Sequence, residues 1–560
     1  MTKLTILPFK EEVDIQTDET VMQALRRGGY EIEGPCNGQG ICGKCRIRVE
    51  DPADVPPTPH RRISETEALE EGIRLACRLI PRGDITVHLP DDFSVDARIL
   101  EGEHLGGIEL KPAAVVVSKK DAYWMRYAGE DSEVILHKWG AHFSPKGLAI
   151  DVGTTTLVAT LFCLVTGKEL STSSSINPQT KFGHDVLSRI QKGSTAEGLT
   201  EVAGVVRKEL NRLIQTACAK SNAVMDEILD VVIGGNTTML TLAAAINPEP
   251  LGRLPFTVDI TGGASYAAEE FGLDINPAGR VYVPPIVHAF IGSDITAGVL
   301  ACGCLEKKKP SLFVDVGTNG EMGINSDGRF IVASTAAGPA FEGMGVSSGI
   351  RAVPGAVESA YFDGETIDVK TIDAQPVRGI CGSGIIDIAS ALLKAGVVDA
   401  SGRMKTPEQK ENLQASVADR LMLVDDQPVF NIAERVSFTQ ADIRQVQLAK
   451  GAIRTGIDML LAEATLTPAD LEDITLAGAF GYHLRPDSLA AIGLIPDQLA
   501  RKVRFAGNTS KTGCAMMLIN ASLREYLEEQ AQSIEHLPLA EKMSFQDLFI
   551  ENLNFPDSDA

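Results

Sequence analysis

The sequence has no excess of positive charge. Its 75 Asp and Glu residues outnumber its 52 Lys and Arg residues, and the formal net charge is −23. Such a chain has no general attraction for phosphate backbones or anionic lipids, and no clustered Lys/Arg tract overrules this balance. We therefore expect neither a nucleic acid nor a membrane as a partner.

Long apolar runs are also missing. The opening residues 1–16 alternate apolar and polar side chains as a strand does, without the apolar stretch of a signal peptide. No later segment reaches the roughly 18 uninterrupted apolar residues that indicate a membrane-spanning helix. We expect a cytoplasmic protein, and its 560 residues with 44% hydrophobic side chains are enough for three or more domains.

Cysteine is scarce except near the start of the chain. Four of the ten cysteines fall in the first 80 residues, in the spacing C-x5-C-x2-C-x31-C: Cys36, Cys42, Cys45 and Cys77. In a reducing compartment such clustering indicates metal binding rather than disulfides. Three cysteines on one glycine-rich loop favour an iron-sulfur cluster, since a zinc ribbon usually has two CxxC pairs and only one is present. A structural zinc site is the alternative.

The residues around these cysteines predict a small, strand-rich domain. The patterns indicate a hairpin, a helix and two later strands, at residues 4–9 with 11–16, 19–30, 45–50 and 84–90. This arrangement resembles the β-grasp fold of [2Fe-2S] ferredoxins over residues 1–93. Five residues separate the first two cysteines, where the plant-type pattern has four, and five is the spacing of the adrenodoxin-like branch.

Residues 94–146 have no clear period and are interpreted as a short linker or middle region. They contain both tryptophans of the chain, Trp124 and Trp139. Packing of this segment onto its neighbours explains them, and a docking or dimer surface is the alternative.

A duplicated pattern dominates the rest of the chain. Residues 148–162, LAIDVGTTTLVATLF, and residues 312–325, LFVDVGTNGEMGIN, share Asp-Val-Gly-Thr at equivalent places. Each copy follows an apolar strand and precedes a second strand, a turn and a third strand. The sequence therefore predicts two β-meanders, each with an Asp-x-Gly-Thr turn.

Such a turn has a chemical use. Glycine lets the backbone approach a phosphate, free amides and Thr hydroxyls donate to its oxygens, and Asp holds Mg²⁺ or its water shell. A later strand runs into AGAFG at residues 477–481, where a nucleoside can lie against bare backbone. The Walker A pattern is absent, and the order of these elements resembles the actin, sugar kinase and Hsp70 superfamily.

The predicted fold class is therefore a multidomain α+β protein. A duplicated α/β ATPase domain is expected over residues 147–560, with lobes at roughly 147–310 and 311–525 and a C-terminal tail. Further motifs suit the cleft between such lobes: NPQTKFGHDVLSRI (177–190), VVIGGNTTML (231–240), HAFIGSDITAGVL (288–300), STAAGPAFEGMGVSSG (334–349), GICGSG (379–384) and FAGNTSKTGCAMML (505–518).

A ferredoxin module joined to this ATPase, together with these motifs, resembles the reductive activators of corrinoid enzymes. The resemblance implies an ATP-hydrolysing, often homodimeric protein that takes an electron from an upstream donor. It would return the corrinoid cobalt of a methyltransferase system from Co(II) to Co(I). ATP, Mg²⁺ and a [2Fe-2S] cluster are the implied cofactors.

We hypothesise roles for particular residues. Cys36, Cys42, Cys45 and Cys77 would hold the cluster, and Asp151 and Asp315 would organise Mg²⁺ and water. Phosphate would be held by Gly153, Thr154, Thr155, Gly317, Thr318 and Gly320, and adenosine would be bordered by Gly478 and Gly481.

The remaining cysteine and histidine candidates are interpreted as structural residues. Cys302, Cys304 and Cys381 are interpreted as buried structural thiols, and His184, His288 and His483 as structural histidines. Asp185 and Asp294 could line the cleft. Three rival functions stay open: an activator of another low-potential enzyme, a redox-sensing ATPase that donates no electron, and, least favoured, a kinase.

Overall fold

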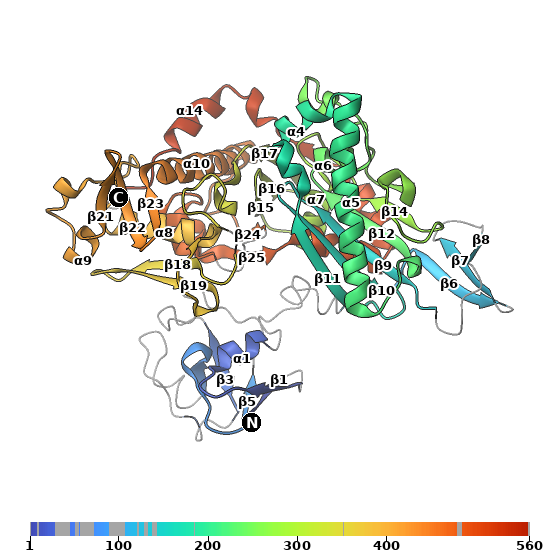
Figure 1. The fold of residues 1–560 in the computed structure, drawn as a ribbon, viewed down its shortest axis with the longest axis horizontal. Coiled ribbons are helices and arrows are strands. Elements are labelled where there is room, and N and C mark those ends of the chain that lie inside the picture. Colours follow the sequence, from blue (N-terminus) through green and yellow to red (C-terminus); the bar gives the residue numbers. More distant parts are fainter. Residues whose placement is uncertain are drawn as a thin grey trace. The chain divides into compact units, whose positions relative to one another are not determined.

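The computed structural model describes most of the chain. It covers residues 2–7, 11–27, 45–50, 55, 72–88, 107–119, 122–127, 133–136, 143–183, 185–350, 352–478 and 484–557. The chain divides into two compact units, Met1–Gly106 with His483–Arg485, and Gly107–Tyr482 with Pro486–Ala560 (Figure 1).

The first unit contains a five-stranded sheet in the order β2-β1-β5-β3-β4. Its elements are β1 (Thr2–Leu7), β2 (Glu11–Ile15), α1 (Val21–Arg27), β3 (Arg46–Val49), β4 (Ile73–Leu75) and β5 (Ile85–His88). β1 and β2 form the predicted antiparallel hairpin, and β5 joins β1 in parallel. Leu4 and Ile6 of β1 pack with Val21 and Leu25 of α1 in a core that also contains Cys45. The predicted strands and helix are confirmed where the structure describes them.

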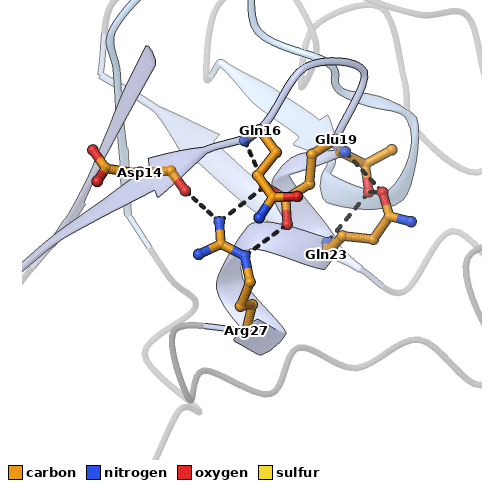
Figure 2. A network of polar contacts seen from close by, with 6 residues as sticks. Asp14, Gln16, Glu19, Gln23 and Arg27 are labelled. Atoms are coloured by element: carbon orange, nitrogen blue, oxygen red, sulfur yellow. Dashed lines mark hydrogen bonds and ion pairs between the residues drawn. The ribbon is translucent and has the colours of Figure 1, made fainter. Parts of the chain in front are cut away.

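Polar contacts fasten the end of α1 to the preceding strand, as Figure 2 shows. Arg27 donates through Nε and Nη2 to the two carboxylate oxygens of Glu19, at 3.0 and 2.9 Å, and through Nη2 to the carbonyl of Asp14. The hydrogen bond from Arg27 lowers the pKa of the Glu19 carboxyl. In the sequence, α1 ends nine residues before Cys36, so these contacts fix one end of the segment that leads to the cysteines.

A small sheet opens the second unit. β6 (Ala114–Lys119), β7 (Ala122–Tyr127) and β8 (Glu133–Leu136) are antiparallel neighbours, and Trp124 lies in β7. The Tyr127 hydroxyl donates to Asp230 Oδ1 at 2.7 Å, while Arg524 Nη2 donates to Asp230 Oδ2 at 2.6 Å. Both oxygens of the buried Asp230 carboxylate are therefore satisfied, which anchors this sheet to the larger body of the unit.

The first lobe is built on a six-stranded sheet, β11-β10-β9-β12-β14-β13. The meander β9 (Lys146–Val152), β10 (Thr156–Cys163) and β11 (Glu169–Ile176) is followed by β12 (Ile228–Gly235), β13 (Ala264–Ala267) and β14 (Arg280–Val283). The apolar face of α5 (Ala196–Ser221) packs on the meander, where its Val206 and Leu210 meet the core of β9 and β10. The sheet and helix therefore share one core.

The second lobe repeats this plan with the sheet β25-β24-β15-β16-β17-β26. Its meander is β15 (Ser311–Val316), β16 (Gly320–Ser326) and β17 (Arg329–Thr335), and β24 (Asp473–Ala477), β25 (Val503–Gly507) and β26 (Ile534–His536) complete the sheet. α10 (Gln440–Glu463) packs on β16 and β17. Two three-stranded sheets are added: β18 (Ala356–Phe362), β19 (Ile367–Thr371), β20 (Gly379–Ile380), and β21 (Leu421–Val424), β22 (Gln427–Ala433), β23 (Val436–Thr439).

Shorter helices fill the remaining positions. They are α4 (Val186–Gly193), α6 (Thr237–Ala243), α7 (Ser293–Ala301), α8 (Gly382–Lys394), α9 (Ala415–Ala418), α11 (Pro486–Ala491), α12 (Thr509–Ile519), α13 (Ser522–Ala531) and α14 (Ser544–Glu551). None of the helices in the described part of the chain combines the length and apolar character needed to cross a membrane.

The duplication extends beyond the meanders. β9 pairs in parallel with β12, and β15 pairs in parallel with β24, so each Asp-x-Gly-Thr turn lies beside the end of a parallel strand. The helices α7 and α12 also correspond, and they cross closely. A Cβ on Gly513 would lie 2.0 Å from the Ala297 carbonyl, and a Cβ on Gly298 would lie 2.6 Å from Thr509 Oγ1. Glycine is therefore required where α7, which follows β14, meets α12, which follows β25.

Candidate functional site

The two predicted turns face each other. Gly153 N donates to the Thr156 carbonyl at 3.0 Å, and Gly317 N donates to the Asn319 carbonyl at 2.9 Å, so the turns close in similar ways. The hydroxyls of Thr155 and Thr318 lie 3.4 Å apart. These residues are far apart in the sequence, and the fold brings their hydroxyls to one point between the two lobes. Two such turns can hold a polyphosphate from both sides.

Asp151 ends β9 in a fully satisfied position. Its Oδ2 accepts a hydrogen bond from Asn508 Nδ2 at 2.7 Å, and its Oδ1 accepts one from Ser510 Oγ at 2.8 Å. Burial raises the pKa of the Asp151 carboxyl, and these two hydrogen bonds oppose that rise. The sequence marked residues 505–518 as a cleft motif but did not identify Asn508 and Ser510 as partners of Asp151.

Asp315 ends β15 among other acids. Burial, then the negative charges of Asp151 and Glu342, raise the pKa of its carboxyl to about 7. Burial, then Asp151 and Asp315, raise the pKa of Asp294 to about 8. The pKa of Glu321 is raised well above its usual range by burial, then by Asp294 and Asp315. We call Asp151, Asp294, Asp315, Glu321 and Glu342 the carboxylate cluster.

The sequence identified only part of this cluster. Asp151 and Asp315 were assigned roles and Asp294 was a weaker candidate, but Glu321 and Glu342 were missed. Glu321 occupies the position at which the first meander has Leu157, and this replacement of an apolar residue by an acid was the available signal. Glu342 ends a short 3-10 helix and accepts from Thr318 Oγ1 at 2.7 Å. The sequence marked residues 334–349 as a cleft motif but did not identify Glu342 within it.

The carboxylate cluster has the chemistry of a divalent cation site. Several acids that share one buried region repel one another once ionised, and a cation removes that repulsion. Within the described residues, no three His, Cys, Asp or Glu side chains stand in direct metal-binding geometry. Mg²⁺ commonly keeps several waters and is bound through one or two carboxylates together with phosphate oxygens, and the carboxylate cluster could supply such carboxylates.

Different physical reasons account for the glycines of the site. A Cβ on Gly317 would have nothing nearer than 3.6 Å, so the backbone there is open to a ligand. Gly478 has φ +120° and a Cβ there would lie 2.4 Å from the Val316 carbonyl, so the strand end needs glycine beside the second turn. Gly320 faces Ile453 and Thr335, so packing explains it.

The other predicted residues of the nucleotide site are placed more simply. A Cβ on Gly153 would lie 2.8 Å from the Thr156 carbonyl, so this glycine allows the turn to close. Thr154 is buried within the same turn. Gly481 lies outside the described residues.

Two of the four cluster cysteines lie in the described residues, and they lie together. Cys45 Sγ and Cys77 Sγ are 3.2 Å apart in the core of the first unit. The backbone supports this, since Ala76 N donates to the Cys45 carbonyl at 2.8 Å. Two thiols at this separation fit neighbouring ligands of one metal centre. Cys36 and Cys42 lie outside the described residues.

The remaining candidates have structural surroundings. The hydrogen bond to Cys304, followed by burial, raises the pKa of the Cys302 thiol well above its usual range, and Cys381 Sγ donates to the Val357 carbonyl. Asp185 caps α4 by accepting from Ser188 N. His288 stacks on His536 with ring centroids 3.9 Å apart. His184 and His483 lie outside the described residues.

Comparison with protein families gives three matches along the chain. The 2Fe-2S iron-sulfur cluster binding domain matches residues 4–82, the RACo middle region matches residues 146–307, and the C-terminal domain of RACo, the ASKHA domain, matches residues 309–560. These matches confirm the predicted fold class, an N-terminal ferredoxin domain followed by an ATPase-type body.

Individual proteins agree. The corrinoid activation enzyme RamQ of Eubacterium limosum is 28% identical over 588 aligned residues, which cover 98% of each chain. The [Co(II) methylated amine-specific corrinoid protein] reductase of Methanosarcina barkeri is 28% identical over 313 residues, 52% of this chain and 54% of that one. A solved structure of a reductive activator for corrinoid, iron-sulfur protein is 29% identical and has a TM-score of 0.75. The alignment covers 100% of this chain and 99% of that one. The three family matches, in this order, and the end-to-end likeness to two activators support a reductive activator of corrinoid proteins.

Proposed function

We propose that this protein activates a corrinoid protein by ATP-dependent, one-electron reduction of its cobalt from Co(II) to Co(I). The observation that carries the proposal is the union, in one chain, of a 2Fe-2S domain with two Asp-x-Gly-Thr turns that meet at Thr155 and Thr318. The relatives named for corrinoid activation and corrinoid protein reduction support this assignment. The corrinoid partner would belong to a methyltransferase system.

The first unit supplies the electron. Cys36, Cys42, Cys45 and Cys77 hold a [2Fe-2S] cluster, which when bound passes one electron at a time. The distance of 3.2 Å between Cys45 Sγ and Cys77 Sγ supports these two residues as ligands. The spacing of the cysteines in the sequence supports Cys36 and Cys42. An upstream reductant reloads the cluster. The two buried thiols position the cluster against the sheet of the ferredoxin domain.

The second unit binds and hydrolyses ATP. Asp151 and Asp315 organise Mg²⁺ and water, while Gly153, Thr154, Thr155, Gly317 and Thr318 hold the phosphates and Gly320 supports the second turn. Gly478, with Gly481 beyond it in the sequence, borders the adenosine. The fit rests on the facing hydroxyls and on the carboxylate cluster, whose crowded acids a cation would stabilise in their ionised form.

An energy source is needed because the reduction is uphill. A plant-type [2Fe-2S] ferredoxin has a potential near about −400 mV, and Co(I) is a stronger reductant. For a one-electron transfer, each factor of ten against the reaction corresponds to about 59 mV. Closure of the two lobes on ATP can change how the corrinoid protein is held and so favour the reducible cobalt state.

The organisation of the chain follows from these roles. We assign the ferredoxin domain to residues 1–93, the linker or middle region to 94–146 and the ATPase domain to 147–560. The protein acts in the cytoplasm, and a homodimer is the proposed assembly.

The test mixes reduced protein with a Co(II) corrinoid protein, with and without MgATP, and follows the visible spectrum. Growth of the Co(I) bands only with MgATP is the expected result. ATP turnover without Co(I) would overturn the proposal and favour a redox-sensing ATPase or an activator of another enzyme. Co(I) formation at the same rate without nucleotide would show that ATP is not part of the reaction.

A further inference from the structure

A buried arginine lies near the first phosphate turn and has no assigned role. Arg189 of α4 has no exposed surface. Its Nε donates to the Gly183 carbonyl at 3.1 Å, and its Nη1 points to Met239 Sδ at 3.0 Å. Its Nη2 is buried with no hydrogen-bond partner in the described structure. A buried, unpaired donor on a charged group is costly, so a partner is expected.

The surroundings connect Arg189 to the first turn. Met239 Sδ also lies 3.8 Å from Asn177 Nδ2, and that amide donates to the Gly153 carbonyl at 2.9 Å. Only two side chains therefore separate the guanidinium from the backbone of the turn. Burial lowers the pKa of Arg189 to about 10, so the group is still charged at neutral pH.

A second unpaired atom lies on the opposite lobe. Glu342 accepts from Thr318 Oγ1 through Oε1, but its Oε2 is buried without a partner in the described structure. The negative charges of Asp185 and then of Glu342 act on Arg189, yet no ion pair joins Arg189 to Glu342 within the described residues. The unpaired cation and anion therefore lie on the two lobes that carry the facing turns.

We propose that Arg189 binds the terminal phosphate of ATP. This rests on the nucleotide site of the proposed function. Arginine presents a fixed fork of donors that matches phosphate oxygens, and an arginine supplied within the same chain can stabilise the charge of a transferred phosphoryl group. Glu342, held by the second turn, faces the same phosphate from the other lobe and contributes to the field that attracts Mg²⁺.

The proposal predicts discrimination between nucleotides. R189Q removes the charge and the fork, so binding of Mg-AMPPNP should weaken about 10- to 100-fold, as expected for loss of a charge-assisted hydrogen bond. Binding of MgADP, which lacks the terminal phosphate, should change less than about 3-fold. Isothermal titration of the full chain measures both, and the visible spectrum of the iron-sulfur cluster checks that the protein is intact.

The matched control is Arg207 on α5. It is a partly buried guanidinium of the same lobe, and it donates to the carbonyls of Ala243 and Glu270, away from the turns. R207Q should leave the ratio of AMPPNP to ADP affinity as in the wild type. R189K keeps the charge without the fork and is expected to lose part of the AMPPNP affinity, so it provides the test even where R189Q is poorly folded.

Three results would overturn the proposal. One is unchanged AMPPNP affinity in R189Q and R189K. Another is equal loss of AMPPNP and ADP binding. The third is recovery of AMPPNP affinity in R189Q/E342Q, which would mean that Arg189 serves only to pair with Glu342. A wild-type protein that binds neither nucleotide would instead overturn the proposed function.

Discussion

The two Asp-x-Gly-Thr turns share a sequence and differ in their surroundings. In the first, both oxygens of Asp151 accept hydrogen bonds, from Asn508 and Ser510. In the second, Asp315 lies near Asp151 and Glu342, and these negative charges add to burial in raising the pKa of its carboxyl to about 7. The first aspartate is held in place by neutral donors, whereas the second lies where negative charge accumulates.

This difference shows how a duplicated fold becomes an asymmetric site. The equivalent strands give both aspartates the same backbone position at a strand end. Burial and then the negative charges of Asp294 and Asp315 raise the pKa of Glu321 in the second meander, whereas the first meander has the apolar Leu157 at the aligned position. The pKa of about 7 predicts that the Asp315 carboxyl in the second turn changes its protonation near neutral pH.

The largest expected effect comes from removing each aspartate. D151A and D315A should each reduce ATP-dependent Co(I) formation by about 100-fold or more, since each removes a carboxylate that we propose to organise Mg²⁺. The visible spectrum of the iron-sulfur cluster should not change. Activation that persists in both variants would falsify the assignment.

The same two variants should differ in stability without nucleotide. D151A leaves the Asn508 and Ser510 donors without their acceptor and should lower the free energy of unfolding by about 1 to 3 kcal/mol. D315A removes a buried acid that its neighbours repel and should raise the melting temperature at pH 8. An equal loss of unfolding free energy in the two variants would contradict the proposed difference between the two turns.

The next effect is the pH dependence of the metal-free protein. The pKa values of Asp315 and Asp294, about 7 and about 8, lie far above their value of 3.8 in the unfolded chain. Between about pH 4 and pH 8 the folded protein therefore binds more protons than the unfolded chain, and the free energy of unfolding falls as pH rises. Thermal melts in EDTA should show this fall, and MgADP should reduce it. D294N should flatten the profile, while a profile that rises over this range would contradict the raised pKa values.

A smaller effect is expected from Asp294 itself. D294N replaces a buried acid by a neutral group of similar size, so it should stabilise the metal-free protein at pH 8 by about 1 to 2 kcal/mol. It should also weaken Mg²⁺-dependent nucleotide binding several-fold. Denaturant unfolding measures the first change and titration the second. The control that should leave nucleotide binding unchanged is D470N, in the exposed loop before β24, where the Asp470 carboxylate accepts from Thr467 N.

The smallest effect should come from the support of the first turn. S510A removes one of two hydrogen bonds to Asp151 and should cost about 1 kcal/mol of stability, with a modest loss of ATP turnover. N508A should cost more, because Asn508 also caps α12 by accepting from Lys511 N. Identical melting curves for both variants and the wild type would show that Asp151 does not depend on these donors.

Much of the fold was predictable because its signals are local. The alternation of apolar and polar residues predicted β1, β2, β3 and β5 of the ferredoxin domain, and the duplicated Asp-Val-Gly-Thr pattern predicted both meanders. The end of α8 also has a local signal, because Gly396 follows the helix and adopts φ +69°, a conformation that favours glycine. The parallel partners of the meanders, β12 and β24, were seen as motifs but not as equivalent elements, because parallel pairing joins segments distant in sequence.

The sequence by itself determined the cysteine spacing, the two turn peptides and the order of the domains, since each depends on residues close together in the chain. Only the tertiary structure decided which groups those turns meet. Asn508 and Ser510 donate to Asp151 although 357 and 359 residues separate them from it in the sequence. Arg189 and Glu342 each have a buried polar atom without a partner in the described structure, and the turn peptides do not predict this. Burial and the summed charge of a site depend on three-dimensional neighbours, which is why the asymmetry of two nearly identical peptides appears only in the folded chain.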